Sequence, residues 1–166
     1  MSDADYVIPA GAGIGHVHLK VSDIDRALAF YCGVLGFKLV ARFKESAAFV
    51  ASGDYHHHIG LNTWESRGAS PAPARHTGLY HVAIRYPQRR DLAVAVRRVI
   101  RSGVPLHGSS DHGVSISIYT EDPDGIGLEL TWDRPPEQWP RTPQGEVELR
   151  MADPFDLEAL LQEADS

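Results

Sequence analysis

The chain has 166 residues and carries 16 basic and 22 acidic side chains, which gives a net charge of −6. This acidic balance argues against a nucleic-acid-binding protein, because such proteins present a basic surface to phosphate. Hydrophobic residues make up 43% and charged residues 23%, which is ordinary globular usage and excludes a largely disordered chain. The length suits one domain, or two small halves packed together.

Cysteine occurs once, at Cys32, whereas histidine occurs nine times. A single cysteine cannot form an internal disulfide, so the composition favours a reducing compartment and we expect a cytoplasmic protein. The opening MSDADYVIPAGAG has neither a basic nor an apolar signal region, and no apolar run reaches membrane-spanning length. We therefore expect neither a signal peptide nor a membrane partner, and we look for chemistry among the histidines.

The chain repeats its own pattern of elements. Two alternating segments, 15–21 and 80–86, predict strands, and an amphipathic helix signal follows each one. In the first half, Ser22 and Asp25 have the spacing of a capping box, with aspartate replacing the usual glutamate. The second helix is indicated by an apolar stripe that Gly103 would end, formed by Leu92, Val96, Val99 and Ile100.

Three further strands are expected after each helix: 37–43, 47–51 and 56–64 in the first half, and 104–107, 114–121 and 126–132 in the second. The order is βαβββ twice. Because one such half cannot close its own sheet, we expect an α+β fold in which two modules pack as a pseudo-twofold pair around a shared metal cleft. This predicts a paired domain over 1–133, with modules at about 14–64 and 78–133, followed by an extended proline arm and short helix over 134–166.

The strongest chemical signal combines His16, His81 and Glu129. The two histidines occupy matching positions in the repeat, and matching positions of a pseudo-twofold pair converge on the shared cleft. Glu129 stands between two leucines on a predicted inner strand, on the face that meets Tyr119. Two histidines and one carboxylate form a facial triad that leaves open positions on Fe(II) for substrate and dioxygen. The sequence therefore predicts a metal site at these three residues.

Simpler interpretations exist for each residue alone. A histidine on a strand is often a hydrogen-bonded, half-buried side chain, and Glu129 alone would suit a solvated sheet edge. His18 shares the face of His16 and competes with it as a ligand. Alternation predicts that His57 points away from its two histidine neighbours, and Cys32 is expected to be a small buried hydrophobe. The metal hypothesis depends on the joint occurrence at repeat-related positions.

Four segments of the chain resemble the vicinal oxygen chelate superfamily, which includes glyoxalases, fosfomycin- and bleomycin-resistance proteins and type I extradiol dioxygenases. They are GHVHLKVSDIDRALAFYCGVLGF (15–37), TGLYHVAIRYPQRRDLA (77–93), SDHGVSISIYTEDPDGIGLEL (110–130) and DRPPEQWP (133–140). Metal-dependent glyoxalases of this superfamily fill four ligand positions. Here the resemblance places the first module's second position on Gly60, which cannot ligate, so His16, His81 and Glu129 remain, as in the extradiol enzymes of the catechol 2,3-dioxygenase kind.

The resemblance also implies roles for three further residues. Tyr119 falls on the active-site tyrosine of the extradiol enzymes, His112 on the histidine of their HGVS segment, and His57 on their acid–base histidine. It implies Fe(II) cleavage of a catecholic substrate with dioxygen, in which His57 moves a proton and the other two residues hydrogen-bond the substrate oxygens. Mn(II) accepts similar ligands, so the native metal stays open.

Two alternatives within the same superfamily remain at this point. One is a metal-dependent glyoxalase-like lyase, isomerase or thiol transferase, which normally uses a fourth protein ligand. The other is a small-molecule-binding resistance protein without catalysis. Exposed sheet edges and the proline arm are also compatible with a homodimer. The sequence names neither the particular catechol nor the extradiol bond that is cleaved.

Overall fold

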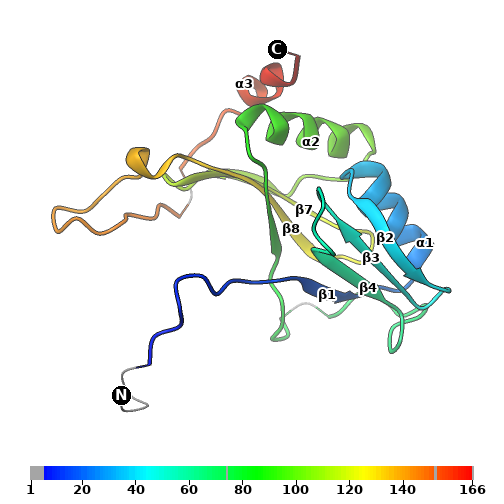
Figure 1. The fold of residues 1–166 in the computed structure, drawn as a ribbon. Helices are drawn as coiled ribbons and strands as arrows, with labels where there is room; N and C mark the ends of the chain where they lie inside the picture. The colour runs from blue at the N-terminus through cyan, green and yellow to red at the C-terminus, as the bar shows by residue number, and fades with distance from the viewer. Residues whose placement is uncertain (1–5, 74, 152, 166) are drawn as a thin grey trace.

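The computed structural model describes residues 6–73, 75–151 and 153–165. The start of the expected paired domain and the last residue of the expected arm region therefore lie outside the described residues. The centre of the structure consists of two four-stranded sheets, one with the order β1-β4-β3-β2 and one with the order β5-β8-β7-β6 (Figure 1). In each sheet the outer strand β1 or β5 runs parallel to its neighbour, and the other pairs are antiparallel. The predicted α+β fold with two βαβββ modules is confirmed.

The first module contains β1 (Val17–Lys20), α1 (Ile24–Leu28), a π-helical continuation η2 (Ala29–Val34), β2 (Lys38–Phe43), β3 (Ala47–Ala51) and β4 (Ile59–Asn62). The second contains β5 (Val82–Arg85), α2 (Arg89–Arg101), β6 (Gly108–Asp111), β7 (Ser115–Glu121) and β8 (Gly127–Asp133). The short elements η3 (Pro136–Gln138), α3 (Leu157–Gln162) and η4 (Glu163–Asp165) follow. Within the described residues, no helix has the length and apolar composition needed to cross a membrane.

The cap of the first helix differs from the predicted capping box. The N-cap is Asp23, whose carboxylate accepts a hydrogen bond from the amide of Arg26 at 2.8 Å. Ser22 instead accepts from the Arg26 guanidinium at 2.6 Å. Both residue types suit an N-cap, so the chain pattern alone could not choose between adjacent positions.

The edge strand of the second module also lies later than predicted. The segment 104–107 forms no strand, although the His107 amide donates to the Tyr119 carbonyl at 2.8 Å, and β6 is formed by Gly108–Asp111. Pro105 has no amide hydrogen to give to a ladder, and its carbonyl accepts from the Thr120 hydroxyl at 2.8 Å. Tertiary context can override the low strand propensity of small polar residues, and here such a segment pairs with β7 at the edge.

One hydrophobic core joins both modules, and a turn of the second module is anchored to the first. The core contains Tyr31, Val50 and Leu61 together with Val96 and Ile118, all fully buried. Through the Asp122–Gly125 turn, the Asp122 carboxylate accepts a hydrogen bond from the Tyr31 hydroxyl at 3.0 Å. Together these contacts fix how the two sheets face each other.

Two further predictions concern Cys32 and the C-terminal helix. Cys32 is half-buried and packs against the core, and burial raises the pKa of its thiol, which therefore stays protonated at neutral pH. The C-terminal helix is shorter than the apolar pattern over 154–164 predicts. It begins after Asp156, whose carboxylate accepts a hydrogen bond from the Ala159 amide at 2.9 Å. The helix α3 packs on α2 (Figure 1). Its residue Leu160 is buried.

Candidate functional site

His81 and Glu129 form the centre of the site in the second module. His81 immediately precedes β5, and Glu129 lies in the adjacent strand β8, where it is paired with Ala83. The His81 Nε2 atom is 2.8 Å from Glu129 Oε2, and the two side chains are 30% and 13% exposed. Two neighbouring strands of one sheet therefore place one nitrogen and one carboxylate oxygen side by side, and both side chains remain partly accessible.

A glycine makes this approach geometrically feasible. A Cβ atom at Gly127 would lie 2.3 Å from the carbonyl oxygen of Tyr80 and 3.3 Å from His81 Cβ. No other residue fits at that separation, because the nearest atom belongs to the backbone. Gly127 thus lets the chain enter β5 close to β8 and positions His81 beside Glu129.

Tyr119 and His112 extend this pair into a chain of polar contacts. Tyr119 faces Glu129 across the β7–β8 ladder, and its Oη lies 3.5 Å from Glu129 Oε1. The His112 Nε2 atom lies 2.7 Å from the same Oη. Burial raises the pKa of the Tyr119 phenol, and the charge of Glu129 raises it further, so the hydroxyl keeps its hydrogen at neutral pH. Four of the six predicted site residues are therefore contiguous.

The other two predicted site residues, His16 and His57, lie together in the first module. Their ring centroids are 4.5 Å apart, and the His57 ring also meets Phe49 at 5.0 Å. Burial lowers the pKa of His57, and the neighbouring imidazoles, His16 first among them, lower it further. The neutral form of His57, which can accept a proton, is thus favoured near neutral pH.

The predicted orientation of the three consecutive histidines is partly wrong. The Nδ1 atoms of His56 and His57 are 2.8 Å apart, so these two rings are not on opposite sides. Residues 52–58 form a turn and β4 begins only at Ile59, so strand alternation does not apply to them. His58 accepts a hydrogen bond from the Ser52 amide at Nδ1, at 3.3 Å.

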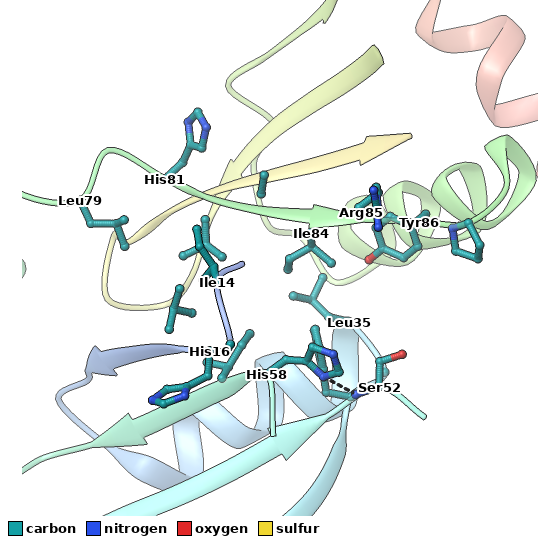
Figure 2. Close-up of a pocket in the computed structure, with 18 residues that line it drawn as sticks. Ile14, His16, Leu35, Ser52, His58, Leu79, His81, Ile84, Arg85 and Tyr86 are labelled. Carbon is teal, nitrogen blue, oxygen red and sulfur yellow. Dashed lines mark hydrogen bonds between the residues drawn. The ribbon is translucent and has the colours of Figure 1, made fainter. Parts of the chain in front are cut away.

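The two modules face each other across a cleft of about 660 Å³ that includes both His16 and His81 in its lining. Figure 2 shows the two histidines on opposite ribbons, with their rings pointing away from one another. Among the residues that the structure describes, no three His, Cys, Asp or Glu side chains are grouped closely enough to hold a metal ion. The structure therefore assembles the His81–Glu129 part of the predicted ligand set, while His16 stands across the cleft.

Gly60 and His18 explain why the first module has no counterpart of Glu129. They are paired in the β1–β4 register, and a Cβ atom at Gly60 would lie 2.9 Å from the His18 ring. The imidazole of His18 therefore fills the space above Gly60 and contacts Phe49 and Trp64, with centroid distances of 5.7 and 5.4 Å. His18, the alternative ligand of the first strand, packs here as part of an aromatic group.

One contact of the site had no signal in the sequence. The His112 Nδ1 atom lies 2.7 Å from the carbonyl oxygen of Arg150, which belongs to the region after the second module. A backbone carbonyl is common to every residue type, so no motif could have indicated it.

Comparison with known proteins agrees with this architecture. The family model of the glyoxalase/bleomycin resistance protein/dioxygenase superfamily matches residues 13–130, and the chain belongs to this superfamily. The chain is 38% identical, over 152 residues, to a catechol-2,3-dioxygenase of Bacillus subtilis (strain 168); the match covers 91% of this chain and 52% of the relative. The chain thus spans about half the length of that relative.

Other relatives represent different activities on the same fold. A biphenyl-2,3-diol 1,2-dioxygenase of Paraburkholderia xenovorans (strain LB400) is 32% identical, with 72% of this chain and 41% of the relative covered. A lactoylglutathione lyase of Salmonella typhimurium is 29% identical, with 69% and 88% covered. A solved glyoxylase/bleomycin resistance protein/dioxygenase domain from Frankia sp. EAN1pec shares the fold, with a TM-score of 0.63, 21% identity, and 75% and 94% covered.

Proposed function

We propose that the chain is an Fe(II)-dependent extradiol dioxygenase that cleaves a catecholic ring with dioxygen. The observation that carries the proposal is the His81–Glu129 pair, joined to Tyr119 and His112 by contacts of 2.7 to 3.5 Å. The likeness to a catechol-2,3-dioxygenase supports the same activity. The small-molecule substrate would enter the cleft between the modules.

The ligand chemistry of the described residues suits the metal. His81, Glu129 and His16 would offer the metal two nitrogen ligands and one carboxylate, a set that suits Fe(II) and leaves it able to take substrate and dioxygen. When bound, the metal would supply electron transfer between a catecholate and dioxygen held side by side. Binding through all three residues requires His16 to approach the pair from across the cleft.

The remaining residues would hold the substrate and move protons. The Tyr119 oxygen lies 2.7 Å from His112 Nε2 and 3.5 Å from Glu129 Oε1, and it would hydrogen-bond a substrate oxygen while His112 orients the phenol. His57, whose depressed pKa favours the neutral imidazole, would take a proton from a catechol hydroxyl and return it to the product. In this proposal the second module would supply two of the three metal ligands, and the first would supply His16 and the proton-transferring His57.

A lyase is the second candidate, because the match to a lactoylglutathione lyase covers 88% of that protein. Gly60 argues against it, since the position that would supply a fourth ligand carries no side chain. A resistance protein that only binds a small molecule would need no metal-ligand pair such as His81 and Glu129.

Anaerobic reconstitution with Fe(II), followed by addition of catechols and air-saturated buffer, tests the proposal. We expect a yellow ring-fission product and consumption of one dioxygen per catechol. Glu129→Gln is the matched control, since it keeps the side chain's shape and removes its charge. Stoichiometrically bound iron without turnover of any catechol would overturn the proposal, and oxygen-independent formation of lactoylglutathione with Ni(II) or Zn(II) would establish the lyase.

A further inference from the structure

We propose that the C-terminal arm positions His112: the carbonyl oxygen of Arg150 holds this imidazole in the tautomer that carries its hydrogen on Nδ1. The arm hairpin, defined as residues 140–150, lies beyond the part of the chain that the family model matches. The importance of this tautomer for ring cleavage rests on the proposed function, whereas the tautomer itself can be measured independently.

The arm hairpin is built by its own backbone contacts. Arg141 pairs with Val147, and the Glu148 amide donates to the Pro140 carbonyl at 2.9 Å. The chain then turns to the end of β6, where the Arg150 amide donates to the His112 carbonyl at 3.0 Å. Arg150 therefore holds His112 twice, through its amide and through its carbonyl.

The tautomer follows from the chemistry of the two partners. A carbonyl oxygen only accepts, so the 2.7 Å contact to Arg150 requires a hydrogen on His112 Nδ1. In the neutral imidazole, Nε2 then has a lone pair, and the partner 2.7 Å away must donate. That partner is the Tyr119 hydroxyl, whose single hydrogen therefore points to His112.

This arrangement has a consequence for the carboxylate of the site. The Tyr119 hydroxyl has one hydrogen and two acceptors within reach, His112 Nε2 at 2.7 Å and Glu129 Oε1 at 3.5 Å. The shorter contact takes the hydrogen as long as Nε2 is an acceptor. Glu129 then keeps its lone pairs available, and the phenol oxygen is oriented by the arm rather than by the carboxylate.

The arm is seated against the turn that carries His112. Gly113 has φ +78, and a Cβ atom there would lie 2.8 Å from Pro140 Cγ and 3.4 Å from Arg150 Cδ. A single methyl group at this position should therefore push the arm hairpin away from His112. Gly103 offers a matched control, because it has φ +79 and a Cβ atom there would meet no heavy atom within 4 Å. Gly113→Ala and Gly103→Ala share the backbone strain, and only the first displaces the arm.

Histidine-labelled protein, studied by ¹⁵N NMR about two pH units above the ordinary histidine pKa, reports the tautomer directly. We expect a protonated Nδ1 and an unprotonated Nε2 for His112 in the unmodified chain and in Gly103→Ala, assigned by their loss in His112→Gln. In Gly113→Ala the two nitrogens should move toward averaged shifts. An Nε2–H tautomer in the unmodified chain, or an unchanged tautomer in a folded Gly113→Ala, would overturn the inference.

Kinetics separate this inference from the proposed function. We expect Gly113→Ala to lower kcat for ring cleavage about 10-fold, with bound iron and KM little changed, as for other residues that orient a catalytic group. Gly103→Ala should retain the full rate. If the unmodified chain cleaves no catechol but the tautomer shifts as expected, the positioning inference stands and the proposed function fails. If Gly113→Ala does not fold, Arg150→Pro deletes the amide bonded to the His112 carbonyl and should give the same shift.

Discussion

The two modules share one backbone plan but place their large side chains on opposite strands. In the first module His18 is paired with Gly60, and in the second module Ala83 is paired with Glu129 at the same register. The large residue thus stands on the first strand in one module and on the last strand in the other. In the first module the conformation of His18 leaves no space for a side chain at position 60, because a Cβ atom there would lie 2.9 Å from the His18 ring.

This exchange gives the modules different chemistry. The first module presents contacting rings, among them His16, His18 and Phe49. The second presents a polar chain from His81 through Glu129 to Tyr119. The two copies of one fold thus differ in the side chains at a single pair of positions, with contacting rings in the first module and a carboxylate in the second.

Removing the carboxylate is expected to have the largest effect. Glu129→Gln should lower ring cleavage by more than about 100-fold, since even residues that support metal ligands cost about 10- to 100-fold. The affinity for Fe(II), measured by equilibrium dialysis, should fall in parallel. Glu121→Gln, a carboxylate at the far end of β7, serves as control and should keep the activity. Full activity in Glu129→Gln would show that the Glu129 carboxylate does not hold the metal.

Adding a side chain at Gly60 tests the exchange from the other module. Gly60→Ala should lower the free energy of unfolding by about 1–3 kcal/mol, because its Cβ meets the His18 ring at 2.9 Å and crowding of this kind is destabilising. His18→Ala in the same chain should recover most of this loss. Urea unfolding of the two single variants and the double variant gives the coupling energy. Additive effects would contradict the steric pairing.

The hydrogen bond between Tyr31 and Asp122, which links the two modules, should contribute less to the free energy of unfolding. Tyr31→Phe removes the hydroxyl that donates to Asp122 at 3.0 Å, at an expected cost of about 1 kcal/mol, because two backbone amides still donate to that carboxylate.

The deficit of Tyr31→Phe should also depend on pH. Burial raises the pKa of Asp122 in the folded chain, so its contribution is complete below the unfolded pKa and is lost as pH rises through the folded pKa. Loss of the Tyr31 donor raises that pKa further. Urea unfolding should therefore show a larger deficit at pH 7 than in acid, and an equal deficit at both pH values would contradict the link.

The smallest effect is expected where the modules are most alike. Each first strand ends in an exposed cation paired with a carboxylate, Lys20 with Glu65 at 3.4 Å and Arg85 with Asp133 at 3.3 Å. Lys20→Ala and Arg85→Ala should each change the free energy of unfolding by less than about 1 kcal/mol, because water screens exposed pairs. The melting temperature of each variant should stay close to that of the unmodified chain at both low and high salt. A large loss in one module only would reveal a further asymmetry.

The repeat and the second half of the site follow from the order of residues along the chain. Alternation places Ile118 and Tyr119 on opposite faces of β7, and the structure buries the first and leaves the second beside Glu129. Period-two patterns and turn residues are local properties, so they predict strands and the faces that side chains share. For the same reason the βαβββ order could be predicted without knowledge of the contacts between the two halves.

Contacts between distant segments were decided only by the tertiary structure. The distance of His16 from the His81–Glu129 pair depends on how one core packs two sheets, which no spacing encodes. The Arg150 carbonyl beside His112 is a backbone group, available at every position, and only the path of the arm selects it. The composition directed attention to the histidines, and only the packing of the strands placed His81 beside the Glu129 carboxylate.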